Sequence, residues 1–356
     1  MYLSDKTILI TGGAGTVGRE LIRQVMSLGP AEVRVVDNNE TAVFFLEEEY
    51  CGGGAGAAPD CDFHAYVGDI RDFDKLRRMM DGVDVVFHCA ALKHVILCEK
   101  SPHDAVQTNI NGVKNIIDAA LENDIERVIF TSSDKAVNPT NVMGTSKLMG
   151  ERLITAANSL KRSRRTIFSS TRFGNVIGSR GSVFSVFYRQ IRDGKPLTLT
   201  DPHMTRFIMT VEEAARLVIE GGGLARGGEV FVTKMPIIRI EDLAHAMIDL
   251  LSRRFGRTAS DFDIRVVGAK PGEKLYEELM SDEETRRAVE LRNMFAVLPA
   301  FRSVYRAIEY DYPDLMTDQV SEPYVSNRYA PMSREELREY IAGNKLIEKL
   351  EQGVLG

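Results

Sequence analysis

A serine, an aspartate and a lysine stand side by side at Ser133, Asp134 and Lys135, and a second lysine follows at Lys147. An adjacent carboxyl group and amine can serve as the acid and the base of a reaction that donates one proton and removes another. The amine must be neutral to act as a base, so we expect burial and the nearby cation of Lys147 to favour the uncharged form of Lys135. Without further context Asp134 is equally well interpreted as a helix cap, because the segment after it turns helical.

Glycines at a regular spacing predict a phosphate-binding turn near the amino terminus. Gly12, Gly15 and Gly18 follow the pattern T-G-x-x-G-x-x-G between an apolar strand and an amphipathic helix. Small residues in this position let the backbone approach a pyrophosphate at the amino terminus of the helix. We therefore predict that this turn, together with Thr16 and Val17, binds a dinucleotide.

Residues at the ends of later strands are further candidates for cofactor contacts. Asp37 ends the second predicted strand, where a carboxylate can accept hydrogen bonds from the adenosine ribose and repel a 2′-phosphate, which favours NAD over NADP. The alternative is that Asp37 caps the next helix, a role that a neighbouring asparagine could fill equally well. Ligands of parallel sheets bind at the carboxyl ends of strands, which adds Asp69, Ile70, Ala90, Ala91 and Lys93. Asp72 fits a helix cap better than a ligand contact.

The elements that must position these residues alternate between strand and helix. Apolar runs predict strands at 7–10, 32–36, 62–67, 84–88 and 127–130, with helical segments between them. Such alternation specifies a parallel sheet covered on both faces, so we predict an α/β fold with a Rossmann-type doubly wound sheet. We place the dinucleotide-binding domain at 1–172 and a smaller α/β substrate-binding lobe at 173–356, interleaved with the first domain. The last predicted helix is capped by Ser333, with Glu336 as its capping-box partner.

Composition excludes several classes of protein. The 356 residues are 44% hydrophobic and carry a net charge of −6, so the chain can bury a large core but has no global positive field to attract nucleic acid. The four cysteines form no CxxC pair and have no histidine at zinc-ligand spacing, so we expect reduced thiols and no metal site. The absence of a long apolar run or a signal sequence predicts a cytoplasmic protein without membrane insertion.

Four longer motifs resemble a known family. They are SSDKAVNPTNVMGTSK (132–147), RFGNVIGSRGSVFSVF (172–187), MTRF (204–207) and KPGEKLYEEL (270–279). In this order they resemble the polysaccharide-biosynthesis branch of the extended short-chain dehydrogenase/reductase superfamily, which contains the UDP-N-acetylglucosamine 4,6-dehydratases. The resemblance covers nearly the whole chain. It implies a UDP-sugar substrate, a tightly held NAD with NADP as the alternative, and a homo-oligomer, either a dimer or a hexamer.

The resemblance also implies roles for the chemically competent residues. In the family resembled, the pair at Asp134 and Lys135 supplies the acid and base of elimination, and the lysine at Lys147 bonds the nicotinamide ribose. Met143 occupies the position of the usual tyrosine base, as it does in part of the dehydratase group, and its thioether cannot take a proton. We therefore expect Lys135 to deprotonate O4, with Ser133 relaying the proton. The alternative is that Met143 only fills core space, the commoner role of methionine.

The second half of the chain carries the substrate contacts that the resemblance implies. Phe173 would lie near the nicotinamide, while Asn175 and Arg206 would contact the diphosphate, since a guanidinium matches phosphate oxygens. The same phosphates would meet a helix start at Ser182 and Val183, the uracil would lie beside Thr198, and the uridine ribose would bind Glu273. As isolated residues, Arg206 and Glu273 would be ordinary solvated surface groups.

Two other functions are compatible with these motifs. A UDP-hexosamine C4 or C5 epimerase would use the same cofactor, although a simple C4 epimerase needs no acid to expel O6. A non-catalytic sensor of a dinucleotide or sugar nucleotide is the alternative from another class, and Met143 is the residue that favours it.

Overall fold

The computed structural model describes residues 2–51, 54–56, 58, 60–160, 166–179, 181–268, 274–301 and 308–353. Glu273 lies outside these residues. The chain divides into two compact units, each made of three segments. Unit 1 comprises residues 1–172, 214–233 and 280–323, and unit 2 comprises residues 173–213, 234–279 and 324–356.

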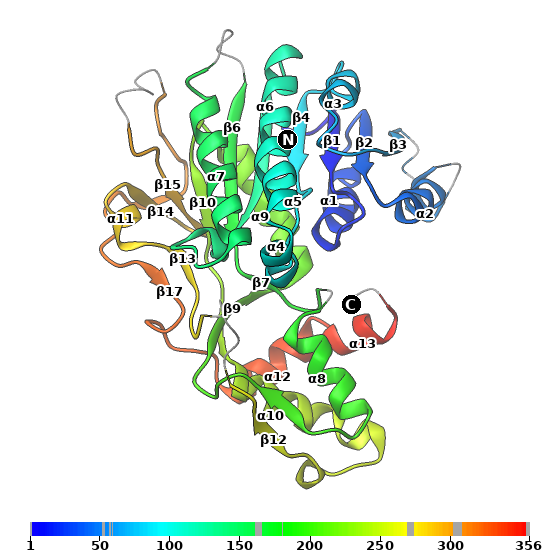
Figure 1. Cartoon of the computed structure of the whole chain (residues 1–356), viewed down its shortest axis with the longest axis vertical. Coiled ribbons are helices and arrows are strands. Elements are labelled where there is room, and N and C mark those ends of the chain that lie inside the picture. Colours follow the sequence, from blue (N-terminus) through cyan, green and yellow to red (C-terminus); the bar gives the residue numbers. More distant parts are fainter. Residues whose placement is uncertain are drawn as a thin grey trace. The chain divides into compact units, whose positions relative to one another are not determined.

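A ten-stranded sheet forms the centre of unit 1, in the order β16-β14-β15-β10-β6-β5-β4-β1-β2-β3 (Figure 1). Its strands are β1 (Thr7–Thr11), β2 (Glu32–Asp37), β3 (Asp62–Val67), β4 (Val85–His88), β5 (Arg127–Ser133), β6 (Ile167–Phe173), β10 (Val230–Thr233), β14 (Ala288–Leu291), β15 (Met294–Val297) and β16 (Leu315–Thr317). β3, β2, β1, β4 and β5 pair in parallel, as do β6 and β10, whereas β15 and β14 add antiparallel strands. All five predicted strands are present. The second half of the chain adds four strands to this sheet, β10, β14, β15 and β16, which its sequence pattern did not predict.

Helices cover both faces of this sheet, which confirms the doubly wound fold. One face buries Leu9, Val86 and Val128 in a cluster with apolar residues of α3 (Phe73–Met79), α6 (Gly112–Glu122) and α7 (Val142–Ala157). The other face carries Ile129 and meets α9 (Val211–Leu224). There Gly222 is so close that a Cβ would lie 2.8 Å from the Ile129 side chain. The remaining helices of the first half are α1 (Thr16–Met26), α2 (Glu40–Tyr50), α4 (Val95–Lys100) and α5 (Pro102–Val106).

Side chains that accept hydrogen bonds from backbone N–H groups fix where several helices begin. Asn39 caps α2, Asp72 caps α3 and Asn141 caps α7. The capping box predicted from Ser333 and Glu336 is present at the start of α12 (Arg334–Gly343). The cap role predicted for Asp72 is therefore also confirmed.

Arg172 joins α7 to the end of β6 through a fully buried ion cluster. Its guanidinium donates to Glu151 of α7 at 2.6 and 2.7 Å and to Glu284 of α11 (Asp282–Thr285) at 2.9 Å. Burial alone would lower the pKa of Arg172, but the charges of Glu151 and Glu284 raise it. Burial would likewise raise the pKa of Glu284, yet the charge of Arg172 holds it at about 2. Arg172 and Glu284 are thus held in their charged forms.

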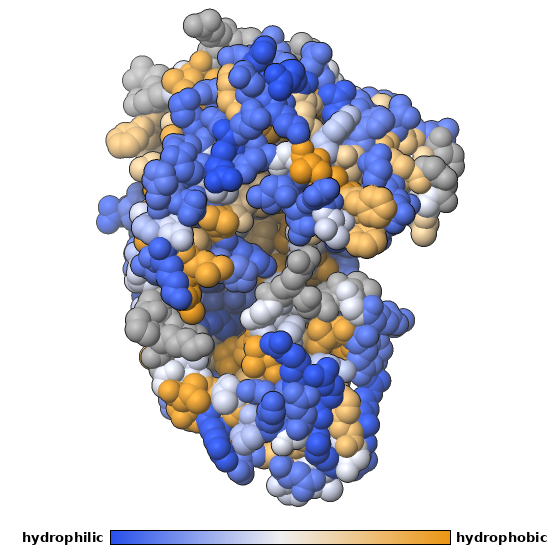
Figure 2. All heavy atoms as spheres, turned by 45° about the vertical axis from the view of Figure 1, so that its right-hand side comes forward, coloured by the Kyte–Doolittle hydropathy of each residue, from blue (hydrophilic) through white to orange (hydrophobic). Residues whose placement is uncertain are grey.

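Unit 2 consists of three small sheets and several helices. β7 (Asn175–Val176), β9 (Thr205–Met209) and β11 (Ile237–Arg239) form one sheet, β8 (Leu197–Leu199) pairs in parallel with β12 (Ile264–Val266), and β13 (Glu278–Met280) pairs with β17 (Tyr324–Val325). Its main helices are α8 (Val183–Arg192), α10 (Ile240–Leu251), α12 and α13 (Leu346–Glu351). In the face that Figure 2 shows, hydrophilic residues predominate and hydrophobic ones form separate small patches. None of the helices in the described residues is long and apolar enough to cross a membrane.

Candidate active site

The glycine-rich turn brings the ends of β1 and β4 into close backbone contact. Gly12 has a φ of 71°, and a Cβ on it would lie 2.6 Å from the backbone nitrogen of Ala90. A Cβ on Gly18 would lie 2.3 Å from the carbonyl oxygen of Gly12. Thr16 and Val17 are the first residues of α1. The N–H groups in the first turn of a helix have no acceptor within the helix. This arrangement suits the close approach of an anionic group.

Asp37 braces the glycine-rich turn instead of capping a helix. One carboxylate oxygen accepts from the backbone N–H of Ala14 at 3.0 Å and the other from that of Asn39 at 3.0 Å. The cap of α2 is the side chain of Asn39, which accepts from Ala42. The alternative in which Asp37 caps this helix is therefore wrong, and its carboxylate lies at the end of β2 beside the turn.

The segment after β3 holds two of the predicted cofactor residues in different surroundings. Asp69 is partly exposed and accepts hydrogen bonds from the Arg71 side chain at 2.6 to 3.0 Å, which lower the pKa of its carboxyl. The side chain of Ile70 is 4% exposed and belongs to the core cluster around α6. Because its side chain is buried, Ile70 could meet an adenine only through its backbone.

The loop after β4 contains Ala90, Ala91 and Lys93 and is fixed by a residue that the motifs did not reveal. Asn109 is 1% exposed and lies in a short π-helical segment (Gln107–Asn111). It accepts from the N–H of Leu92 at 2.8 Å and donates to the carbonyl of Leu92 at 3.0 Å and to the Ser146 hydroxyl at 2.9 Å. Asn109 therefore ties this loop to α7.

Ser133, Asp134 and Lys135 meet at the end of β5. Asp134 is 4% exposed and accepts from the Ser133 hydroxyl at 2.6 Å and from the Lys135 ammonium at 3.1 and 3.2 Å. Ser133 is the cap of the following turn (Asp134–Ala136), so the interpretation of Asp134 as a cap is wrong. The side chain of Lys135 is 36% exposed and ion-paired. The expected burial is thus wrong, and the carboxylate of Asp134 lies where it can stabilise a charged amine.

The deeply buried amine of the site belongs to Lys147. Its Nζ donates to the carbonyl of Thr131 at 3.0 Å and lies 4.5 Å from the centre of the Phe130 ring. Burial lowers the pKa of Lys147 to about 8, against smaller raising effects from Cys89 and Glu151. Lys147 is therefore mostly charged at pH 7 and reaches a balance between its charged and neutral forms near pH 8.

Two polar residues near Lys147, His88 and Cys89, are neutral. Burial lowers the pKa of His88 to about 3, and the charge of Lys147 lowers it further. The Nδ1 of His88 lies 2.7 Å from the Thr11 hydroxyl on the adjacent strand. Burial also raises the pKa of the Cys89 thiol to about 12. The four cysteines of the chain are free, and in the described residues no group of three or more acidic, histidine or cysteine side chains could hold a metal ion.

Met143 lies in the apolar layer under α4 and α5. It is 3% exposed and packs in a cluster with Cys98 and Ala105, next to Val95 and Val142. The interpretation of Met143 as a residue that fills core space is therefore supported by its surroundings.

In unit 2, a buried carboxylate joins the two predicted diphosphate ligands. Glu277 lies 2.8 Å from the side-chain amide of Asn175 and 3.2 Å from the Nε of Arg206. Glu277 belongs to the motif KPGEKLYEEL, but nothing in that motif alone distinguished it from the neighbouring glutamates. Ser182 caps α8, which begins at Val183.

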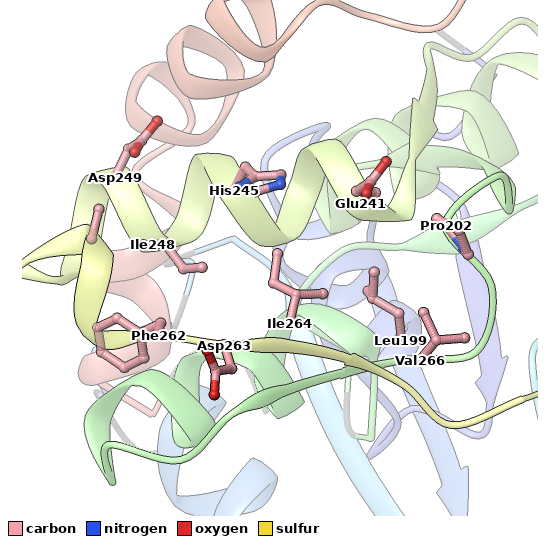
Figure 3. Close-up of a pocket in the computed structure, with 11 residues that line it drawn as sticks. Leu199, Pro202, Glu241, His245, Ile248, Asp249, Phe262, Asp263, Ile264 and Val266 are labelled. Carbon is pink, nitrogen blue, oxygen red and sulfur yellow. The ribbon is translucent and has the colours of Figure 1, made fainter.

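Thr198 lies on β8 next to a pocket of unit 2. Its hydroxyl accepts a hydrogen bond from Gln190 of α8 at 2.9 Å. A pocket of about 370 Å³ lies where Leu199, Ile248 and Ile264 point toward one another from β8, α10 and β12 (Figure 3). Of the residues that were predicted to bind the substrate and that the structure describes, none lines this pocket.

The chain matches a family described as polysaccharide biosynthesis protein over residues 8–299. The chain belongs to this family. It is 48% identical over 298 residues to a protein of Methanocaldococcus jannaschii named only as an uncharacterised membrane protein, with 84% of this chain and 87% of that protein covered. It is 36% identical over 303 residues to the UDP-N-acetylglucosamine 4,6-dehydratase (inverting) of Campylobacter jejuni, with 85% of each covered. It is also 36% identical over 337 residues to a UDP-glucose 4-epimerase of Rickettsia rickettsii, with 95% of each covered.

Solved structures show the same fold. Pen from Bacillus thuringiensis superposes with a TM-score of 0.87 at 40% identity, and 97% of this chain and 99% of that one are covered. DesIV, a dTDP-glucose 4,6-dehydratase from Streptomyces venezuelae whose structure contains NAD and TYD, gives a TM-score of 0.61 at 24% identity, with 76% and 86% covered. The family therefore combines nucleotide-sugar dehydratases and epimerases on one fold.

Proposed function

We propose that this chain is an NAD-dependent nucleotide-sugar 4,6-dehydratase that acts on UDP-N-acetylglucosamine. The observation that carries the proposal is the pair formed by Asp134 and Lys135, which lie within 3.2 Å of each other at the end of β5. Dehydration across C5 and C6 needs a base for the C5 proton and an acid for the departing O6. The dehydratase of Campylobacter jejuni, at 36% identity, supports the same reaction.

The ion pair provides both groups once one proton moves. Transfer of a proton from Lys135 to Asp134 over 3.1 Å gives a neutral amine and a neutral carboxylic acid. A bound sugar that excludes water from this site would favour the neutral pair, because burial disfavours charged forms. Lys135 can then remove the C5 proton, and Asp134 can protonate O6. Oxidation at C4 also releases the O4 proton, which would pass through the Ser133 hydroxyl, 2.6 Å from Asp134, to Lys135 and leave to solvent from this partly exposed amine before elimination begins.

NAD suits the residues at the amino-terminal end of the sheet. The closely packed backbone at Gly12 and Gly18 and the carboxylate of Asp37 would hold its pyrophosphate and its adenosine ribose. When bound, NAD supplies the oxidation at C4 and the reduction at C6. Lys147, close to Thr131 at the end of β5, would donate to the nicotinamide ribose. We further propose that the protein is a cytoplasmic homo-oligomer that serves the synthesis of a deoxy-amino sugar.

The test is to incubate the purified protein with UDP-N-acetylglucosamine and follow the product by mass spectrometry. Loss of one water is the expected result. A C4 epimerase is the second candidate, because the chain is 36% identical to a UDP-glucose 4-epimerase over 95% of both chains. It would give a product of unchanged mass with an inverted C4, which proton NMR detects. A sensor without activity would bind the nucleotide sugar and leave it unaltered.

A further inference from the structure

Glu277 is a buried carboxylate of unit 2 to which the proposed reaction gives no task. Glu277 is the residue before β13, and its side chain is 7% exposed. Both of its oxygens lie 2.8 Å from the amide nitrogen of Asn175, and one accepts from the backbone N–H of Phe207 at 3.1 Å. The Nε of Arg206 lies 3.2 Å from the other oxygen. A carboxylate in this place therefore collects donors from β7 and β9.

The backbone of Glu277 is itself fixed. Its N–H donates to the hydroxyl of Ser326 at 2.9 Å, and the N–H of Ser326 donates to the carbonyl of Glu277 at 2.8 Å. The Ser326 hydroxyl also lies 2.8 Å from that of Thr205, at the start of β9. The backbone of Glu277 is thus anchored to Ser326, which follows β17, and through Ser326 to the start of β9.

Arg206 is held in one orientation by three contacts. Besides the contact with Glu277, its two terminal nitrogens donate to the carbonyls of Thr205 at 2.8 Å and Lys274 at 2.9 Å. The side chain is 13% exposed. A guanidinium is a planar fork, so its orientation decides whether it can meet two phosphate oxygens at once.

We propose that Glu277 is a positioning residue for the diphosphate of the nucleotide sugar, acting by fixing Arg206 before the ligand arrives. Groups that are already ordered lose less conformational entropy on binding, so the affinity for the ligand rises. The inference rests on the proposed function, because it takes Arg206 as a contact of the diphosphate. It also gives a reason for a carboxylate next to an anion site, where it would otherwise repel the ligand.

Substitution of Glu277 by glutamine separates positioning from simple electrostatics. Glu277→Gln removes one negative charge beside the anion, so electrostatics alone predicts tighter binding of UDP. The new amide group, however, must face Asn175, Phe207 or Arg206, all of which are donors, and this clash displaces at least one of them. Positioning therefore predicts that UDP binds about tenfold more weakly. The KM for UDP-N-acetylglucosamine should rise by a similar factor, while kcat stays within about threefold.

The measurement is isothermal titration of the full-length, NAD-loaded protein with UDP, followed by steady-state kinetics. Glu335→Gln is the matched control, because it makes the same change on a side chain of unit 2 that is 76% exposed and lies 3.3 Å from Arg338. It should leave UDP affinity unchanged. If Glu277→Gln does not fold, Glu277→Asp replaces it. Its shorter side chain cannot reach all the donors, so it should also weaken UDP binding.

The outcomes distinguish this inference from the proposed function. The inference alone is overturned if the wild type dehydrates the substrate and binds UDP, while Glu277→Gln or Glu277→Asp binds UDP equally well or more tightly. Wild-type protein that does not bind UDP overturns both. Weaker UDP binding with a raised KM and a preserved kcat supports the inference, whereas an equal loss in kcat for an unchanged KM contradicts it.

Discussion

The buried ammonium of Lys147 makes a quantitative prediction about stability. Burial lowers its pKa from 10.5 to about 8 in the folded protein, and the difference of about 2.5 units corresponds to about 3 kcal/mol. Between these two values the unfolded chain still holds the proton that the folded protein has released. The free energy of unfolding therefore rises with pH, by up to about 1.4 kcal/mol per unit. This contribution is complete above pH 10.5 and is lost as the pH falls through about 8.

The assay compares urea unfolding of the wild type and Lys147→Met, both stripped of nucleotide, between about pH 7 and about pH 10.5. Titrating groups that do not interact with Lys147 cancel in the difference between the two proteins. That difference should shift in favour of the wild type by about 3 kcal/mol over the range. Lys195→Met is the control, because the Lys195 side chain is 69% exposed, and its difference should stay flat. A difference for Lys147→Met that is equally flat would refute the link between burial and charge at this site.

Further predictions follow from other contacts of the structure. Arg172→Met leaves two buried carboxylates without their cation and should lower the free energy of unfolding by about 3–5 kcal/mol in urea; a loss below about 1 kcal/mol would contradict the cluster. Lys135→Ala should slow dehydration about 10²–10⁴-fold and stop solvent deuterium entering C5. Asp134→Asn should still admit deuterium at C5 while water loss stalls. Met143→Ala should keep measurable turnover. If Met143→Ala is inactive while Lys135→Ala dehydrates the substrate at a near-normal rate, the chemistry belongs to position 143. Acid denaturation of the purified protein should release NAD, and release of NADP would overturn the role given to Asp37.

The first half of the fold could be predicted because local pattern and long-range structure agree there. β1, β4 and β5 are central strands that are almost completely buried, so their apolar composition reveals them, whereas β3 lies at the edge of the sheet and is largely exposed. The second half could not be predicted in the same way. β10, β14, β15 and β16 are four, four, four and three residues long, too short for a periodic pattern. β14 and β15 follow each other and pair together, but their place in the sheet depends on the pairing of β15 with β10, which lies far away in the sequence.

The positions of the candidate residues at the strand ends could be predicted from the sequence, but their burial could not. Motifs correctly indicated that Ser133, Asp134 and Lys135 stand together, since adjacent residues at a strand end cannot separate. Whether an amine is buried depends on tertiary packing, and here Lys147 is buried at 6% exposure while Lys135 is partly exposed. Glu277 was missed for a related reason. Its partners lie 70 and 102 positions away along the chain, and a glutamate among several others carries no sign of such contacts.

The surroundings of Met143 show why proton transfer would move to the end of β5. A tyrosine base at this position would need its hydroxyl in a polar site next to Lys147, but the side chain here is enclosed with Cys98 and Ala105. An unsatisfied hydroxyl in that cluster would cost about 1–3 kcal/mol, which a thioether avoids. Asp134 and Lys135 can instead exchange a proton directly, because they are in contact. A site with this pair can carry both an acid and a base without a tyrosine, which is the combination that elimination needs and simple C4 epimerisation does not.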